Sequence, residues 1–342
     1  MATLTTLALD AMGGDNGPSI VIDALTQALT TFTEIHFIVV GDEIELQPLL
    51  RQAQLLGHPR VTLKHASQTV TMTDKPGYSL RAKPDSSMRV ALELVATGEA
   101  KACISAGNTG ALMTNAYFTL KTLPGVLRPA LVSAIPQQHE KFSLMLDLGA
   151  NPVCDSETLF QFGVMGAVAA QEVLGIQQPR VALLNVGEEE TKGNDVVKAT
   201  AVLFQQSPII NYVGFIEGDD IFANQADVIV CDGFVGNITL KSCEGLADLL
   251  LNNIKDNIHE HLLTRWFVKL FYRRLQRSWN WLKPDHYNGA SLIGLRGVVI
   301  KSHGDANARA FFSAIEQAVA ETQRDLPARI RDCVEQVLLE QE

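Results

Sequence analysis

The chain has 342 residues, of which 46% are hydrophobic and 19% charged, and its formal net charge is −10 at pH 7. This composition is typical of a globular protein and excludes a disordered or fibrous one. The excess of acidic residues argues against general nucleic-acid binding, because such binding needs a dense basic surface that displaces counterions from phosphates.

The first ten residues carry no basic segment ahead of an apolar one, so no secretory signal peptide is predicted. No run reaches the roughly 18 apolar residues of a membrane-spanning helix. The five cysteines form no Cys-x-x-Cys pair and have no metal-ligand spacing, which suits a reducing compartment. We therefore expect a cytoplasmic protein with no metal site, no cofactor and no catalytic cysteine.

Short apolar, β-branched runs repeatedly end in Gly, Asp or Asn and are followed by helix-like periodicity. This alternation predicts an α/β fold with a mostly parallel sheet covered by helices. The expected strands are 4–9, 35–40, 61–65, 102–105, 143–147, 181–186, 212–217, 228–231 and 297–301. The expected helices are 18–29, 43–56, 86–97, 111–120, 156–174, 195–206, 238–257 and 306–324.

Two stretches interrupt the alternation. Residues 67–84 are polar and irregular, and a connection of that length is often functional. Residues 247–286 are long, helical and rich in aromatic residues, which predicts a helical insertion projecting from the sheet. The whole chain, 1–342, is expected to form a single α/β domain that contains this insertion.

The turns after the expected strands deliver small residues with a carboxylate, an amide or a cation to one sheet edge, where open α/β sheets bind ligands. Glycine lets backbone N–H groups approach a ligand, and the start of the following helix favours an anion. Phosphate binding is therefore predicted there, although a tight connection needs the same residue types. The turns are 10–15, 105–110, 147–151, 185–190, 217–220, 232–237 and 301–304.

Several motifs of other enzyme classes are absent from the sequence. There is no G-x-G-x-x-G after the first strand and no G-x-x-x-x-G-K-[ST], the signatures of dinucleotide and nucleotide binding. There is also no G-x-S-x-G elbow and no H-E-x-x-H. These absences disfavour hydride transfer, nucleotide hydrolysis, serine hydrolysis and zinc proteolysis.

The ordered set of turns resembles the bacterial phosphate acyltransferases, which are acyl-acyl-carrier-protein:phosphate transacylases. The resemblance runs from about residue 7 to about residue 320. It departs from the expected pattern at Ala223 and Asn224, where a glycine would be expected. The matching segments are 10–15, 81–88, 105–110, 147–151, 185–190 with Lys192 and Gly193, 231–237 with Lys241, and 301–304.

The resemblance implies a three-layer α/β/α fold related to phosphotransacetylases and to isocitrate and isopropylmalate dehydrogenases, and it implies a homodimer. The implied reaction is the reversible transfer of a long-chain fatty acyl group from acyl-acyl-carrier protein to inorganic phosphate. The product, an acyl phosphate, would enter phospholipid synthesis through a membrane-bound glycerol-3-phosphate acyltransferase.

The residues at the turns suit this chemistry. Attack of phosphate on a thioester needs no activated serine or cysteine, because phosphate is already largely a dianion near neutral pH. The enzyme must hold that anion beside the acyl carbonyl, stabilise the oxyanion of the tetrahedral intermediate and let a thiolate leave. Backbone amides, amide side chains, lysines and one histidine are sufficient for these tasks.

Individual roles follow from this scheme. Asn237 would polarise the acyl carbonyl, and His303 would protonate the leaving sulfur because the pKa of histidine lies near working pH. Carboxylates would orient lysines and loop amides, since a carboxylate that touched phosphate would repel it. Tight turns, helix caps and surface lysines explain the same residues without catalysis. The catalytic candidates are His303, Asn237 and Lys192, and the binding candidates are Gly13, Gly14, Lys83, Gly107, Asn108, Thr109, Asp147, Asn151 and Asp232.

Residues 264–283 contain six basic residues, no acidic residue and all three tryptophans of this acidic chain. On a helical wheel they predict an amphipathic helix, which would bind an anionic membrane surface at the inner face of the cell membrane. Alternatively, the aromatic face packs in a dimer interface and the basic face meets the acidic carrier protein. The candidate contact residues are Phe267, Phe271, Leu275 and Trp279 on the apolar face, with Lys269 and Arg273 among the basic residues.

Three other functions remain open at this point. A short-chain acyl-CoA:phosphate acyltransferase would use the same turns. The fold would also tolerate a metal-dependent decarboxylating dehydrogenase. A non-catalytic scaffold that recruits lipid-synthesis enzymes to the membrane would not depend on the turn residues at all.

Overall fold

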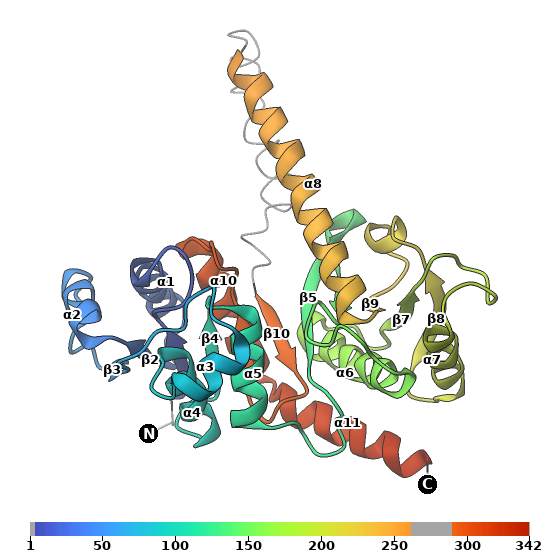
Figure 1. Ribbon diagram of the computed structural model, residues 1–342, viewed down its shortest axis with the longest axis horizontal. Helices are drawn as coiled ribbons and strands as arrows, with labels where there is room; N and C mark the ends of the chain where they lie inside the picture. The colour runs from blue at the N-terminus through green and yellow to red at the C-terminus, as the bar shows by residue number, and fades with distance from the viewer. Residues whose placement is uncertain (1–3, 261–288, 342) are drawn as a thin grey trace.

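Figure 1 shows the computed structural model of the chain, in which residues 4–260 and 289–341 are described. Within these residues an eleven-stranded sheet has the order β3-β2-β1-β4-β11-β10-β5-β6-β9-β7-β8. The strands are β1 (Thr5–Asp10), β2 (Ile35–Gly41), β3 (Val61–His65), β4 (Ala102–Ser105), β5 (Ala130–Gln137), β6 (Lys141–Leu146), β7 (Arg180–Leu184), β8 (Asn211–Ile216), β9 (Val228–Val230), β10 (Ala290–Ile293) and β11 (Val298–Lys301).

The helices begin where the sequence supplies capping groups. Side chains of Asp, Ser or Asn accept a hydrogen bond from the first turn of α2, α4, α5, α6, α7 and α10. Pro18 opens α1, where a missing N–H costs little. The helices are α1 (Pro18–Thr31), α2 (Glu43–Gln52), α3 (Pro76–Ala82), α4 (Ser87–Ala96), α5 (Thr109–Leu120), α6 (Ser156–Leu174), α7 (Asp195–Gln206), α8 (Gly233–Glu260), α10 (Ala308–Gln323) and α11 (Leu326–Gln341), and the 3₁₀ turns are η1 (Gln138–Glu140) and η2 (Asp220–Phe222).

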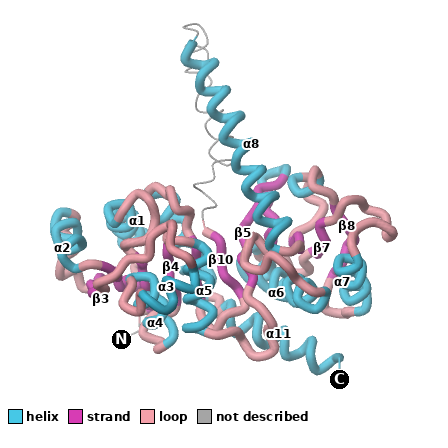
Figure 2. Tube along the Cα trace, in the orientation of Figure 1, coloured by secondary structure: helices cyan, strands magenta, loops and turns pink. Residues whose placement is uncertain are grey.

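The sheet has two parallel halves joined by antiparallel strands. We call β3, β2, β1, β4 and β11 the first half, since all five run in the same direction. We call β5, β6, β9, β7 and β8 the second half; β6, β9, β7 and β8 are parallel, and β5 is antiparallel to β6. Between the halves, β10 is antiparallel to both β11 and β5, and Figure 2 shows it at the centre of the molecule. The predicted α/β fold with a mostly parallel sheet is confirmed.

Each face of the first half buries its own set of side chains, because successive residues of a strand point to opposite faces. Leu7 and Leu9 of β1 pack in a cluster with α1 and α10, whereas Ala8 packs in a cluster with α4 and α5. In the second half, α6, α7 and α11 cover one face through a cluster that includes Phe162 and Phe204. Helices on both faces of the sheet give the three layers that the resemblance implied.

Four elements were not expected from the sequence. The strands β5 and β10 are the antiparallel ones at the centre, and neither of them leads directly into an α-helix. The short helix α3 lies within the stretch 67–84 that was expected to be irregular, and α11 follows the last expected helix. The helix expected at 238–257 in fact begins at Gly233. Figure 1 shows α8 extending well beyond the body formed by the other described elements.

Candidate active site

Three turns of the first half meet at one edge of the sheet, those after β1, β4 and β11. The turns approach so closely that a Cβ on Gly13 would lie 2.6 Å from the backbone N of Gly107. A Cβ on Gly14 would lie 3.0 Å from the carbonyl oxygen of Gly304, and the N–H of Asp15 donates to that oxygen at 2.7 Å. Close contact between the turns therefore requires glycine at positions 13 and 14, and it brings Gly13 beside Gly107.

Asp10, the last residue of β1, connects these turns through hydrogen bonds. Its side chain is 1% exposed, and it accepts a hydrogen bond from Ser105 Oγ at 2.6 Å and one from the backbone N–H of Met12 at 3.3 Å. Burial raises the pKa of Asp10, while the hydroxyl and N–H donors oppose that rise. The N–H of Gly107 donates to Ser105 Oγ. These groups hold the turns together, so a phosphate cradle made by the glycine N–H groups stays a prediction.

Asn108 caps α5, whose first residue is Thr109. Its Oδ1 accepts from the N–H of Ala111 at 2.9 Å, and its Nδ2 donates to the carbonyl of Met72 at 2.6 Å. The loop that contains Met72 is fixed by Lys83, whose Nζ donates to Asp74 Oδ2 at 2.5 Å. This ion pair lowers the pKa of Asp74. Asn108 and Lys83 thus stabilise the local structure, and their predicted contacts with phosphate are untested.

Lys301 ends β11 and is a buried cation that the sequence analysis did not place among the candidates. Its side chain is only 8% exposed, and its ammonium group donates to the carbonyl of Ala106 at 3.4 Å and to that of Ser302. Burial, together with repulsion by Lys241, lowers the pKa of Lys301 to about 8. The available signal was its position at the end of a continuous apolar strand, which is typical of strands buried on both faces.

His303 lies two residues beyond β11 and contacts α8. Its Nδ1 is 2.5 Å from Asp305 Oδ1, and its Nε2 is 3.6 Å from Glu244 Oε1 and 3.4 Å from Lys241 Nζ. The nearby carboxylate of Glu244 is the largest cause that raises the pKa of His303. The imidazole is therefore biased toward its protonated form, which is the form that a proton donor needs.

In the second half, Asp147 organises the turn after β6. Its side chain is fully buried, and its Oδ1 accepts from the backbone N–H groups of Leu131, Gly149 and Ala150 at 2.9, 3.2 and 3.0 Å. Its Oδ2 accepts from the backbone and side chain of Asn151 at 2.5 and 2.9 Å. Burial raises the pKa of Asp147, and these N–H donors oppose the rise. Asp147 and Asn151 therefore hold the turn together, and their contact with substrate stays a prediction.

The start of α8 packs directly on this turn. A Cβ on Gly236 would overlap the carbonyl oxygen of Asp147, so only glycine fits there. Asp232 accepts from the N–H of Val235 at 2.8 Å and caps the helix. Asn237 is exposed and lies beside Gly149, where a Cβ would be 3.5 Å from the Cβ of Asn237.

One face of α8 connects the two halves. Residues 237, 241 and 244 are spaced at i, i+4 and i+7, so they lie on the same side of the helix. Lys241 and Glu244 contact His303 of the first half, and Asn237 lies about one helical turn, roughly 5.4 Å, closer to the second half. The structure therefore brings the catalytic candidates His303 and Asn237 to a shared region.

Lys192 lies in a different loop, the one that follows β7. It is exposed, and a Cβ on Gly187 would lie 2.8 Å from its Cγ. Its N–H donates to the carbonyl of Glu189 at 2.9 Å. Within the described residues these contacts stay inside the loop, so the geometry does not join Lys192 to His303.

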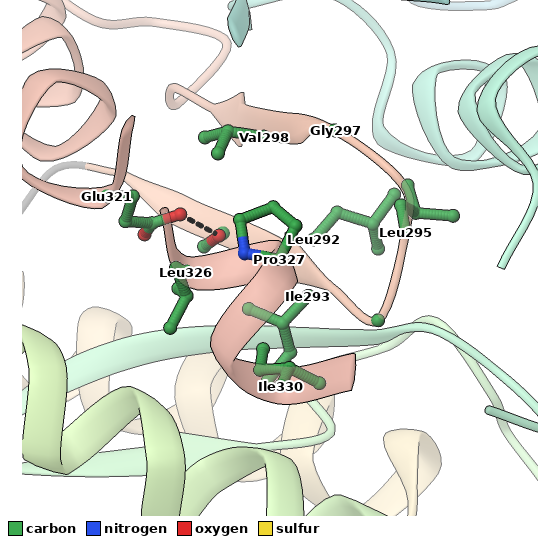
Figure 3. A pocket seen from close by; sticks show the side chains of 11 residues that line it. Leu292, Ile293, Leu295, Gly297, Val298, Glu321, Leu326, Pro327 and Ile330 are labelled. Atoms are coloured by element: carbon green, nitrogen blue, oxygen red, sulfur yellow. Dashed lines mark hydrogen bonds between the residues drawn. The ribbon is translucent and has the colours of Figure 1, made fainter. Parts of the chain in front are cut away.

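A small cavity lies at the other end of β11, as Figure 3 shows. Its lining includes Val298, the first residue of β11, and the buried Glu321 of α10, which accepts a hydrogen bond from Ser291 Oγ at 2.8 Å. Burial raises the pKa of Glu321 to about 7. Because Val298 and Lys301 are at opposite ends of the strand, this cavity is separate from the strand-end turns.

The membrane or partner candidates Phe267, Lys269, Phe271, Arg273, Leu275 and Trp279 lie outside the described residues. In the described part of the chain, none of the helices is long and apolar enough to cross a membrane. That part also contains no group of three His, Cys, Asp or Glu side chains arranged to hold a metal ion.

The sequence matches a family model described as "Fatty acid synthesis protein" over residues 5–329. A phosphate acyltransferase from Idiomarina loihiensis is 60% identical over 335 residues, which cover 98% of each chain. A phosphate acyltransferase from Shewanella sp. (strain MR-4) is 52% identical over 338 residues, which cover 99% of each chain.

Solved structures show the same fold at low sequence identity. A phosphotransacetylase from Streptococcus pyogenes has a TM-score of 0.63 at 17% identity and covers 94% of this chain and 95% of its own. The EutD phosphotransacetylase from Staphylococcus aureus has a TM-score of 0.60 at 18% identity and covers 93% and 94%. The predicted likeness to the phosphotransacetylase fold is thereby confirmed.

Proposed function

Because the chain belongs to the fatty acid synthesis protein family and is an acyltransferase that forms acyl phosphate, we propose that its acyl donor is a long-chain acyl-acyl-carrier protein. The acceptor is inorganic phosphate, and the reaction is reversible. The acyl phosphate then serves phospholipid synthesis, where a membrane-bound glycerol-3-phosphate acyltransferase consumes it.

The observation that carries the proposal is the meeting of α8 with the turns of the first half. His303, whose pKa is raised beside Glu244, offers an imidazole as proton donor. Asn237, on the helix face that carries Lys241 and Glu244, offers a neutral amide. A thioester placed across this face would have its carbonyl near the amide and its sulfur near the imidazole. Preorganised donors of this kind stabilise the charge that develops on the oxyanion.

Phosphate would approach from the turns after β1, β4 and β11. Lys301 and Lys241 supply positive charge there, and the start of α5 at Thr109 adds the positive end of a helix dipole. The dianion needs no general base, because it is already deprotonated near neutral pH. Lys192, in the separate loop after β7, stays a candidate that would neutralise the anion.

The family assignment removes two of the alternative functions. An acyltransferase is neither a decarboxylating dehydrogenase nor a non-catalytic scaffold. A short-chain acyl-CoA:phosphate acyltransferase remains the alternative, because the shared fold with phosphotransacetylases does not determine the acyl donor.

The direct test measures free thiol released from long-chain acyl-acyl-carrier protein by the purified full chain, with and without phosphate. We expect release only with phosphate, in equal amount with acyl phosphate, and at least tenfold faster than release from acetyl-CoA at equal concentration. Faster turnover of acetyl-CoA would contradict the long-chain assignment, and release without phosphate would contradict the acceptor.

A homodimer that associates with the inner face of the cell membrane is the second part of the proposal. Its support is the basic, aromatic composition of residues 264–283 and the exposed Leu246, Leu249 and Leu250 on the helix that leads toward that segment. Co-sedimentation with anionic vesicles should fall in a Phe267→Glu, Phe271→Glu double variant while the oligomeric state stays unchanged. Absence of vesicle binding by the wild type, or loss of the dimer in the variant, would contradict the anchor.

A further inference from the structure

The ammonium group of Lys301 is buried at the end of β11. Lys301 pairs in register with Ser105 of β4 and with Ala290 of β10, so it has a strand on each side. Taking a charged lysine out of water is costly unless other groups replace the lost hydration. A lysine at this position therefore needs a reason to be kept.

The hydrogen-bond partners of Lys301 are backbone carbonyls. Its Nζ donates to Ala106 at 3.4 Å and to Ser302, and the structure describes no ion pair that involves it. Ala106 precedes Gly107 and Asn108 in the turn after β4, and Ser302 precedes His303. The ammonium group thus joins the two turns that carry Asn108 and His303.

Charged groups surround this position from several elements. Asp10 on β1, Asp15 on the following turn and Asp305 after β11 attract the ammonium group, whereas Lys241 on α8 repels it. His303, whose pKa is raised by Glu244, adds a further positive group next to Lys241. Four carboxylates share this region with Lys301, Lys241 and His303, so an anion would be bound by the N–H groups of these three side chains and not by a net positive charge.

We infer that Lys301 is a positioning residue for the phosphate substrate: its ammonium group fixes the turns of Asn108 and His303 relative to each other and draws the dianion to them. This inference rests on the proposed function, since it assumes phosphate as the acceptor. It adds a residue that acts mainly on the affinity for phosphate and not on the acyl donor.

The inference predicts a specific pH dependence. With its pKa lowered to about 8, Lys301 is charged below that pH and neutral above it. Phosphate is mainly a dianion above about pH 7.5, because its second pKa lies below that value, so its affinity should fall as the pH rises from there through about 8. Protonated His303 would also attract phosphate, so the measurement is made in a His303→Gln background, which keeps hydrogen-bonding capacity without a titratable group.

The variants are Lys301→Met, which removes the charge at similar length, and Lys301→Arg, which keeps it at every working pH. The matched control is Lys101→Met, because Lys101 is an exposed lysine just before β4, at the opposite end of that strand from Ser105. We expect Lys301→Met to raise the KM for phosphate at least tenfold and to change the KM for the acyl donor less than twofold. In Lys301→Arg, the phosphate affinity should no longer decrease above about pH 8. The Lys101→Met control should have the same kinetics as the wild type.

The inference is overturned if Lys301→Met shows wild-type kinetics per folded molecule, or if it raises both KM values equally. If Lys301→Met does not fold, the test is the phosphate affinity of the His303→Gln variant between about pH 7.5 and pH 9.5, where phosphate is mainly a dianion. A flat profile over that range overturns the inference. Failure of the wild type to release thiol in response to phosphate is a different result, because it contradicts the proposed function itself.

Discussion

The two halves of the sheet each bury an aspartate at a strand end, but the two carboxylates have different partners. Asp10 in the first half is held partly by hydroxyl groups, among them Ser105 Oγ at 2.6 Å. Asp147 in the second half is held by N–H groups alone, from Leu131, Gly149, Ala150 and Asn151. Hydroxyl groups can rotate to accept a hydrogen bond, whereas N–H groups can only donate.

This difference indicates a division of tasks. The turn after β6 is held by hydrogen bonds to Asp147, and the start of α8 packs on it so closely that Gly236 contacts the Asp147 carbonyl. The turns after β1, β4 and β11 instead gather charged and titratable groups, including Lys301 and His303. We therefore regard the second half as the support for Asn237 and the first half as the holder of phosphate.

The largest expected effect comes from Asp147→Asn. Oδ1 of Asp147 accepts hydrogen bonds from three N–H groups, and Oδ2 accepts from two. In either orientation of the asparagine amide, its NH₂ group therefore faces at least two N–H donors and leaves them without an acceptor. The free energy of unfolding should fall on the order of 4 kcal/mol, measured by urea denaturation.

The matched variant in the first half is Asp10→Asn. There an amide oxygen can still accept from the N–H of Met12, while the NH₂ group donates to Ser105 Oγ after the hydroxyl rotates. The expected loss is about 1 kcal/mol. Equal losses for the two variants would show that the nature of the donors does not distinguish the halves.

The sequence was sufficient to predict the parallel parts of the fold, since most of these strands are short apolar runs followed by a turn and a helix. It did not predict β5 and β10, because antiparallel pairing is set by tertiary contacts and these strands do not lead directly into a helix. Pro136 within β5 also argues against a strand from sequence alone. The start of α8 was missed because Gly233 and Gly236 disfavour a helix unless close packing requires them.

At the site, the turns were predictable because glycine beside a polar residue marks a strand end. Their meeting was not, since it depends on strand order, which brings β11 beside β4 from nearly 200 residues away. Lys301 was missed for a related reason. The apolar run Val298, Val299 and Ile300 indicated a buried strand, but it did not show whether the lysine that ends the strand is buried too, because the neighbouring turns are what bury it.

Two further variants, with the smallest expected effect on stability for Asn237→Ala, separate the two halves by kinetics. Asn108 caps α5 and binds the Met72 carbonyl, so Asn108→Ala should lower the free energy of unfolding by about 1 kcal/mol. It should also raise the KM for phosphate, because it loosens a turn of the first half.

Asn237 is exposed beside Gly149, so Asn237→Ala should leave the urea midpoint unchanged. Its kcat should fall at least tenfold, which corresponds to about 1.4 kcal/mol of transition-state stabilisation.

The division of tasks between the halves requires that these two variants affect different kinetic constants. An amide that polarises the acyl carbonyl acts chiefly in the transition state, so its loss lowers kcat with little change in the KM for phosphate. A turn that holds the anion before reaction acts on binding, so its loss raises the KM for phosphate. Steady-state kinetics with phosphate varied at saturating acyl donor distinguishes the two. If Asn237→Ala raised the KM for phosphate and left kcat unchanged, Asn237 would belong to the phosphate site, and the assignment of the acyl carbonyl to the second half would be wrong.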